Sequence, residues 1–196
     1  MQEAFVGSWA QESHLSAEIL GSLRDLNHRF LDLAAARTEW LAGRVAALSA
    51  AQRAAAAGCP YALFDLRFQD EAHWRVRLQS AGSLRVADEF AVDDERTGFV
   101  RLALFYAWHV ASAADLKAQL LLGMNDSTAA AFRRVTVYQL PGLVVTEAVH
   151  LSARWSGCTA YWSALTAAAS GADPVALRRV QLYGLQLAAA ARLANP

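Results

Sequence analysis

A stripe of large apolar residues near the N-terminus places the strongest constraint on the fold. Its members recur with alternating spacings of four and three residues at Ile19, Leu23, Leu26, Phe30 and Leu33. This spacing puts them on one face of an α-helix and is typical of a helix that packs along a nearly parallel neighbour. We therefore predict a helix that begins after Ser13 or Ser16, with a possible bend at Thr38. Leu23, Leu26 and Phe30 are its predicted interface residues.

Helical signals continue through most of the chain. Ser49 and Gln52 have the spacing of a capping box, and Pro174 follows Asp173 as it would at the start of a helix. The segment 70–81 also shows strand-like alternation, but we favour a helix there. The further predicted helices cover 49–58, 70–81, 99–122, a span from Asp126 or Ser127 to about Gln139, a segment opening at Pro141, and a last helix after Asp173.

The last helix has apolar residues on more than one face. One stripe comprises Leu177, Val180, Gly184, Leu187 and Ala191, and a second comprises Leu182, Leu185 and Leu193. A helix with two apolar faces is either buried on both sides or part of a subunit contact. We therefore add Leu182 and Leu185 to the predicted interface residues.

The composition excludes several classes of protein. The 196 residues carry 18 Lys and Arg against 18 Asp and Glu, so no global charge attracts nucleic acid or an anionic membrane. No apolar run approaches the roughly 20 residues that span a bilayer. The N-terminal segment carries Glu3 and Glu12 and does not resemble a signal peptide, so we expect a cytoplasmic protein with no membrane partner. Cys59 and Cys158 are too few for a disulfide framework or a zinc site.

Two segments of the chain resemble each other at a constant offset. The first contains Leu48-Ser49-x-x-Gln52, Phe64-x-x-Arg67-Phe68 and Trp74, and the second contains Val135-Thr136-x-x-Gln139, Leu151-x-x-Arg154-Trp155 and Tyr161. Such self-similarity is the signature of a duplicated structural unit. The acidic stretch 87–97 is the expected boundary. We predict two helical repeats, residues 1–90 and 91–196, joined in one compact unit.

The second repeat contains a more specific pattern, Leu122-Gly123-Met124-Asn125-Asp126-x-x-Ala129-x-x-Phe132-x-x-Val135-Thr136-Val137-x-Gln139-Leu140. It closely resembles the central segment of the flagellar transcriptional activator subunit FlhD, which reads Leu-Gly-Ile-Asn-Glu and then Leu-Thr-Leu-Pro-Gln-Met. The match extends from Val100 to Trp155. Leu23-x-Asp25-Leu26-Asn27, in the first repeat, resembles the start of the same family. The first copy is truncated, because it lacks the Leu-Gly-x-Asn-Asp segment.

The resemblance implies an all-α fold, a multi-helix bundle built from two FlhD-like helical repeats, the second with an extra C-terminal helix. Family protomers pair through their helices and act in bacterial transcription control with a partner subunit, FlhC, that carries a cysteine-ligated zinc. This chain lacks the four-cysteine cluster, so it resembles the FlhD component alone and is expected to need no cofactor. A tandem of two copies would look like a fused homodimer that binds an FlhC-like subunit or itself.

Arginines are the candidate nucleic-acid contacts. They are Arg133, Arg134, Arg154, Arg178 and Arg179. Their guanidinium groups suit phosphates and guanine edges, and the span from Leu116 to Gln139, with a turn at Gly123, has the outline of a helix-turn-helix. Zero net charge predicts weak non-specific DNA affinity, so we expect DNA to be bound through the partner.

The sequence contains no catalytic signature. Gly-x-Ser-x-Gly, His-Glu-x-x-His and Cys-x-x-Cys are absent, so no enzyme is predicted. The histidines are scattered at His14, His28, His73, His109 and His150, and no metal site is predicted. Two functions remain. The first is an FlhD-like transcription-regulator subunit that assembles with a DNA-binding partner, and the alternative is a helical interaction or adaptor protein without DNA binding.

Overall fold

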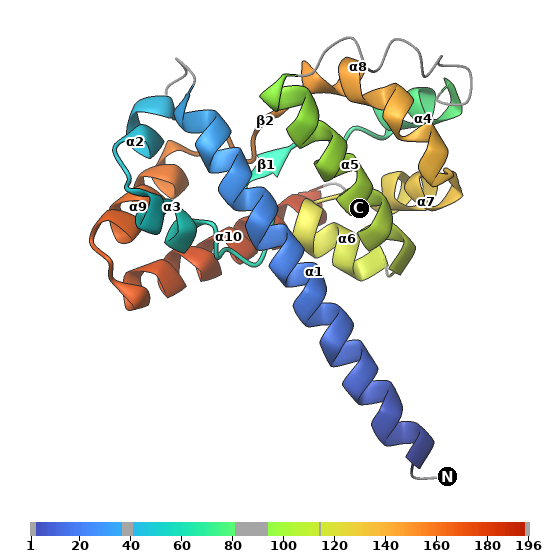
Figure 1. Ribbon diagram of the computed structural model, residues 1–196, viewed down its shortest axis with the longest axis horizontal. Helices are drawn as coiled ribbons and strands as arrows, with labels where there is room; N and C mark the ends of the chain where they lie inside the picture. The colour runs from blue at the N-terminus through green and yellow to red at the C-terminus, as the bar shows by residue number, and fades with distance from the viewer. Residues whose placement is uncertain (1–2, 37–40, 81–93, 114, 195–196) are drawn as a thin grey trace.

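A computed structural model describes residues 3–36, 41–80, 94–113 and 115–194 (Figure 1). The helices are α1 (Glu3–Ala35), α2 (Ala42–Ala46), α3 (Ala50–Ala56), α4 (Glu71–Ser80), α5 (Glu95–Ala113), α6 (Asp115–Leu122), α7 (Asp126–Arg134), α8 (Val144–Ala148), α9 (Thr159–Ser170) and α10 (Pro174–Ala194). Short 3-10 helices, η3 (Val137–Gln139) and η4 (Pro141–Leu143), and short strands, β1 (Phe64–Asp65) and β2 (Ser152–Ala153), complete the fold. The predicted mainly helical class is confirmed.

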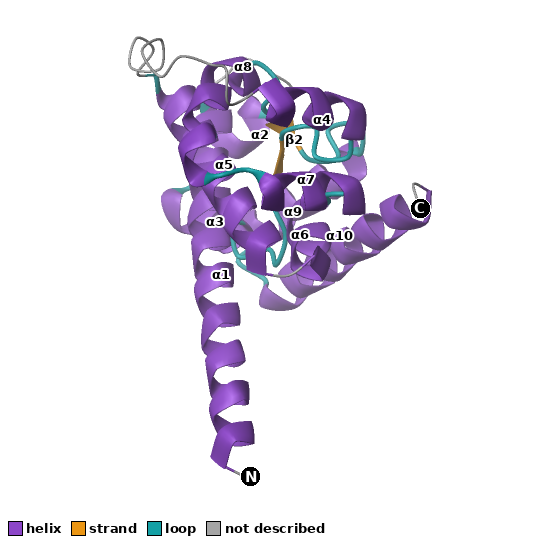
Figure 2. Cartoon of the chain, turned by 90° about the vertical axis from the view of Figure 1, so that its right-hand side faces the viewer, coloured by secondary structure: helices purple, strands orange, loops and turns teal. Residues whose placement is uncertain are grey.

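The long helix α1 runs between two groups of helices. The first lobe consists of α2, α3, α9 and α10, and the second lobe consists of α4, α5, α6, α7 and α8 (Figure 1). Helix α1 contacts α2 and α3 in the first lobe and α5 in the second. Its N-terminal half extends away from both lobes (Figure 2). No helix in the described part of the chain is long and apolar enough to cross a bilayer.

The chain crosses between the lobes in both directions. Helix α4, from the N-terminal half of the sequence, packs on α7 in the second lobe, whereas α9, from the C-terminal half, packs on α3 in the first. Where the two paths meet, β1 and β2 pair antiparallel, with Phe64 opposite Ala153 and Asp65 opposite Ser152. The buried apolar side chains of both lobes form one continuous cluster. The predicted boundary near residue 90 lies outside the described residues.

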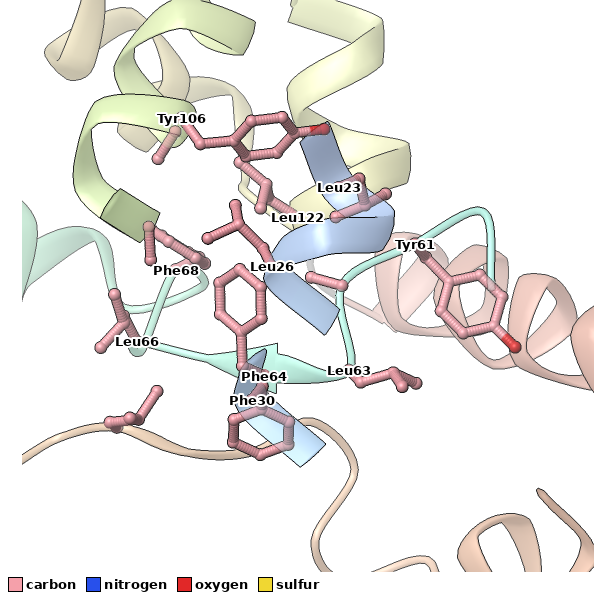
Figure 3. Close-up of a cluster of buried hydrophobic side chains, with 14 of the residues drawn as sticks. Leu23, Leu26, Phe30, Tyr61, Leu63, Phe64, Leu66, Phe68, Tyr106 and Leu122 are labelled. Atoms are coloured by element: carbon pink, nitrogen blue, oxygen red, sulfur yellow. The ribbon is translucent and has the colours of Figure 1, made fainter. Parts of the chain in front are cut away.

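The predicted stripe of α1 faces this core. All five of its side chains, from Ile19 to Leu33, are buried. The Phe30 ring lies 6.1 Å from that of Phe64 (Figure 3). It also lies 6.0 Å from the ring of Phe99, and Phe64 and Phe99 meet edge to face. Leu23, Leu26 and Phe30 therefore pack against their own chain. Their predicted role as interface residues is corrected: α2 and α3 from the first half of the chain and α5 from the second half pack against this helix, so these side chains are not open to another subunit.

A buried amide joins α1 to the segment that enters β1. The Asn27 side-chain nitrogen donates toward the carbonyl oxygens of Ala57, Cys59 and Tyr61, at 3.3, 3.4 and 2.9 Å, and its oxygen accepts a hydrogen bond from the Leu63 amide at 2.8 Å. Asn27 is fully buried. Irregular backbone in a protein interior needs such partners, because water cannot satisfy it. One side chain therefore pairs with four backbone groups of this inter-lobe segment.

The starts of α3, α4 and α10, which are capped by nearby side chains, agree with the sequence prediction. The Ser49–Gln52 capping box is present at α3. The Asp70 carboxylate accepts from the His73 amide at the start of α4, and the Asp173 carboxylate accepts from the first amides of α10. Capping involves residues within about three positions of each other, so it can be predicted from the sequence without knowledge of the tertiary fold.

Other boundaries differ from prediction. Helix α1 begins at Glu3, before either serine considered as its cap. The expected helix over 99–122 corresponds to α5 and α6, which lie on either side of residue 114, outside the described residues. Helix α7 ends at Arg134 because Val135 and Thr136 are extended. Thr136 and Gln139 instead form a second capping box, at η3. Thr38 and most of the 87–97 connector lie outside the described residues.

Gly184 tests the packing of α10 on the loop before β1. A Cβ atom there would overlap the hydroxyl and ring of Tyr61, which is fully buried and donates a hydrogen bond to the Val180 carbonyl at 3.3 Å. We expect Gly184→Ala to lower the free energy of unfolding by about 1–3 kcal/mol through overpacking. Gly21→Ala, where nothing lies within 4 Å, should raise it by about 0.5–1 kcal/mol. Urea denaturation measures both, and equal effects would contradict this packing.

Asn27 tests the hydrogen bonding of the inter-lobe segment. Asn27→Ala leaves the Leu63 amide and several carbonyls buried without their partner, so the free energy of unfolding should fall by about 2–4 kcal/mol. Asp25→Ala, on an exposed position of the same helix, should change it by less than about 0.5 kcal/mol. Chemical denaturation of the two variants provides the comparison. A fall in the free energy of unfolding of less than about 1 kcal/mol for Asn27→Ala would show that water replaces the amide.

Candidate functional site

Helix α7 presents two of the predicted arginines to solvent. Asn125 caps it by accepting a hydrogen bond from the Thr128 amide at 2.7 Å. The buried face of α7 places the Phe132 ring 4.8 Å from that of Trp74 in α4. The opposite face, in the last turn, exposes Arg133 and Arg134. Cations are favourable at a helix C-terminus, so this placement also stabilises α7.

The α6–α7 pair resembles a helix-turn-helix only in outline. Gly123 forms the turn with a φ of +76°, a left-handed conformation that suits glycine. The first turn of α7 carries Asp126, which accepts a hydrogen bond from Gln119 of α6. A recognition helix contacts base edges with its N-terminal residues, whereas the α7 arginines lie at the C-terminal end. This geometry favours contacts to phosphates or to a protein over base readout.

A groove lies between α4 and α7, with a volume of about 360 Å³. We call it the α4–α7 groove. Its lining comprises Glu71, Arg75, Leu78 and Gln79 from α4, Ser127, Thr128, Ala130, Ala131 and Arg134 from α7, and Val135 and Gln139 beyond α7. Arg75 lies 3.7 Å from Glu71, an exposed pair of small energetic value. The groove therefore offers guanidinium and amide groups around a floor of small side chains.

Among the residues that the structure describes, the most exposed large apolar side chain is adjacent in the sequence to a residue that lines this groove. Tyr138, in η3 next to Gln139, is 85% exposed. Tyrosine and arginine are both enriched at protein interfaces, where an aromatic ring provides contact area at a low entropy cost. The α4–α7 groove and Tyr138 together form the candidate interaction surface.

Arg154 is buried, unlike the other predicted arginines. It is 5% exposed, and its guanidinium donates to the Leu121 carbonyl at 3.1 Å and lies 4.6 Å from the centre of the Trp155 ring. Burial lowers its pKa to about 10, and the charge of Asp65 acts in the opposite direction. The group also lies against Gly123, where it leaves no room for a Cβ atom. Arg154 is thus a structural residue, which corrects its predicted role in nucleic-acid contact.

The α10 residues divide between surface and core. Arg178 and Arg179 are exposed on this helix in the first lobe, apart from the α4–α7 groove. Leu182 is 51% exposed, whereas Leu185 is half-buried and packs against the core. The structure therefore does not bring the α7 and α10 arginines into one cluster, and only Leu182 of the predicted interface residues is largely open to solvent.

A cluster of ionisable side chains was missed by sequence reasoning. His73 of α4 lies with its Nε2 2.7 Å from Oε2 of Glu147 in α8, and the Arg77 guanidinium lies 3.2 Å from Oε1 of the same carboxylate. Glu147 is fully buried. The His150 ring meets that of His73 edge to face, with centres 5.0 Å apart. Burial lowers the pKa of His150, although the Glu147 charge acts in the opposite direction.

Part of this cluster has a signal in the sequence. Glu147 and His150 are three residues apart, a spacing that places two side chains on one face of a helix. Because one member of this pair is a glutamate, the spacings among histidines and cysteines do not reveal the pair. The approach of α4, which brings His73, depends on the tertiary fold.

A second polar cluster is sealed inside the first lobe. The Tyr161 hydroxyl donates to the Tyr61 hydroxyl at 3.2 Å, and the Cys59 sulfur lies 3.8 Å from the Tyr161 oxygen. Burial raises the pKa of the Cys59 thiol to about 11 and raises the pKa of both phenols. These groups are protonated at neutral pH, so Cys59 does not supply a reactive thiolate.

Comparisons of the chain with protein-family models, curated proteins and solved structures find no match. Function is therefore inferred from the residues of the molecule. The features available for that inference are the α4–α7 groove, the arginines beside it, and the sequence pattern around Gly123.

Because Arg154 is buried whereas Arg134 and Arg178 are exposed, we expect their substitutions to differ in their effect on stability. Arg154→Ala removes one of the two donors to the Leu121 carbonyl and the cation near the buried Asp65, so the free energy of unfolding should fall by about 3 kcal/mol. Arg134→Ala and Arg178→Ala, at exposed positions, should change it by less than about 0.5 kcal/mol. Thermal or urea unfolding of the three variants tests the ranking. Similar losses in all three would contradict the assignment of Arg154 to the interior.

Proposed function

We propose that this chain is an FlhD-like subunit of a transcription regulator that acts by assembling with a DNA-binding partner protein. The observation that carries the proposal is the α4–α7 groove, built on the helix whose sequence resembles the family. Arg75 and Arg134 lie on opposite walls of this groove, and the exposed Tyr138 is the sequence neighbour of the lining residue Gln139. This combination suits a protein segment with carboxylate or amide groups.

We propose further that the chain consists of two diverged copies of one helical unit, the equivalent of a fused homodimer. The two capping boxes, at Ser49 and Thr136, support the duplication because they lie at the same offset as the sequence repeat. The paired strands support it too, since Asp65 and Ser152 are equivalent under that offset and stand opposite each other. An approximate two-fold axis would pass through this pair.

Further support comes from the helices that follow the strands. Helices α4 and α9 are equivalent under the same offset. Helix α4 of the first copy packs on α7 in the second lobe, and α9 of the second copy packs on α3 in the first lobe. The carbonyls of the equivalent residues Arg67 and Arg154 each accept a hydrogen bond from a tryptophan of the following helix, Trp74 at 3.1 Å and Trp162 at 2.9 Å, although Trp162 lies one position beyond Tyr161, the equivalent of Trp74. Exchange of equivalent elements is a common means of dimer formation.

The distribution of charge favours binding through a partner over direct DNA contact. The zero formal charge of the chain provides no long-range attraction for a polyanion. The four exposed arginines predicted as nucleic-acid contacts lie on two separate helices, Arg133 and Arg134 on α7 and Arg178 and Arg179 on α10, so these four do not form one cluster. A complex in which the partner reads the bases, while α7 contributes a few contacts, matches this distribution.

The proposal is tested with an FlhC-type partner and promoter DNA. Fluorescently labelled DNA is titrated with the chain alone, with the partner alone and with both, at two salt concentrations. We expect weak, salt-sensitive binding by the chain alone and much tighter binding by the pair. Arg75→Ser with Arg134→Ser should weaken formation of the protein pair at least about tenfold, which corresponds to about 1.4 kcal/mol.

The matched control is Arg178→Ser with Arg179→Ser, which removes two exposed arginines from α10 and should leave assembly unchanged. If the two double variants weaken assembly equally, the groove is not the contact surface. Formation of the protein pair without DNA binding would favour the alternative, a helical adaptor. Absence of both pair formation and DNA binding would overturn the proposed function.

A further inference from the structure

The cluster around Glu147 has the donor set of a transition-metal site. It combines imidazole nitrogens from His73 and His150 with one carboxylate oxygen, and these ligand atoms lie within 4.8 Å of one another. Zinc and related ions are bound by such mixed imidazole and carboxylate groups, with a position left open where the protein supplies three ligands. In a tetrahedral site, Zn–N and Zn–O bonds of about 2.1 Å need ligand atoms about 3.4 Å apart. Small side-chain rotations would bring the three ligands to that separation.

Two ligands come from one turn of the chain and the third from a different helix. The Glu-x-x-His spacing of Glu147 and His150 is the arrangement by which helices present a carboxylate and an imidazole to one ion. The backbone amide of His150 donates to the Glu147 carbonyl at 3.0 Å, so the helical turn continues to the histidine. His73 approaches from α4, whose first turn Asp70 caps.

The neighbours of the cluster already orient these groups. Oε1 of Glu147 accepts from Thr146 at 3.4 Å and lies 3.2 Å from the Arg77 nitrogen, which leaves Oε2 directed at His73. Hydrogen bonding of a ligand carboxylate by outer groups is usual in metal sites. The edge-to-face contact of the His73 ring with Trp74, at 5.4 Å, restricts its rotation. Among the described residues, the His150 ring makes no hydrogen bond.

The local charge limits how tightly a cation can bind. Arg77 neutralises Glu147, so a divalent ion would enter without an excess of negative charge. Binding must also replace the direct contact between His73 and Glu147. Both effects point to an affinity well below that of a four-cysteine structural site, and to a borderline ion such as Zn²⁺ over Mg²⁺ or Ca²⁺, which require more oxygen ligands.

We propose that His73, Glu147 and His150 bind one Zn²⁺ or similar transition-metal ion, with water in the remaining position. The ion would connect α4 to the end of α8, where the contact between His73 and Glu147 now does so. Because α4 also forms one wall of the α4–α7 groove, the bound ion would hold that wall in place. The inference depends on this cluster alone and is independent of the proposed transcriptional role.

The test is metal binding by the chelator-treated full chain. Isothermal titration with Zn²⁺ should give one site per chain, with a Kd in about the micromolar range. Titration with Co²⁺ should produce the visible absorption bands of a four-coordinate ion. Mg²⁺ at the same concentrations should give neither signal. A stoichiometry near zero for both transition metals would overturn the proposal.

Variants separate this site from adventitious binding. His150→Gln removes a half-buried ligand and should weaken Zn²⁺ binding at least about tenfold. His109→Gln, at an exposed position of α5, is the matched control and should leave the Kd within about twofold. His150→Asp, which restores an oxygen ligand, should recover part of the affinity. Circular dichroism verifies that each variant folds, and unchanged Zn²⁺ binding by a folded His150→Gln variant would refute the site.

Discussion

The structure depends on the buried amide of Asn27. The segment from Ala57 to Leu63 passes between the two lobes without regular secondary structure, and the side chain of Asn27 pairs with four of its backbone groups. An unpaired buried peptide group costs about 1–3 kcal/mol. Asn27 satisfies several such groups at once and thereby fixes the point at which the chain enters β1. The register of Phe64 against Ala153, and with it the joining of the lobes, follows from that contact.

Features encoded by neighbouring residues were predictable. The caps at Ser49 and Asp173 and the stripe of α1 involve residues within one or two turns of one another, and the structure contains all of them. The partner of that stripe was not predictable in the same way. Periodicity shows that Leu23 faces something apolar, but it is equally compatible with another subunit and with a distant part of the same chain.

The candidate site shows the same division. Arg134 and Arg154 are indistinguishable as residue types, yet one lies on a groove and the other is enclosed between Leu121, Trp155 and Gly123. Only tertiary structure separates a surface cation from a buried one. The cluster at Glu147 is a parallel case, because its sequence signal comprises two residues and the third arrives from α4.

The exchange of α4 and α9 between the lobes has a consequence for synthesis on the ribosome. Helix α3 has its partner α9 more than a hundred residues later in the chain, as the contact between Gln52 and the Ser170 carbonyl, at a sequence separation of 118, illustrates. Contacts that distant form slowly, and the apolar surface that awaits them stays exposed meanwhile. The first half therefore emerges as an unfinished lobe that α9 and α10 close only once they have been synthesised.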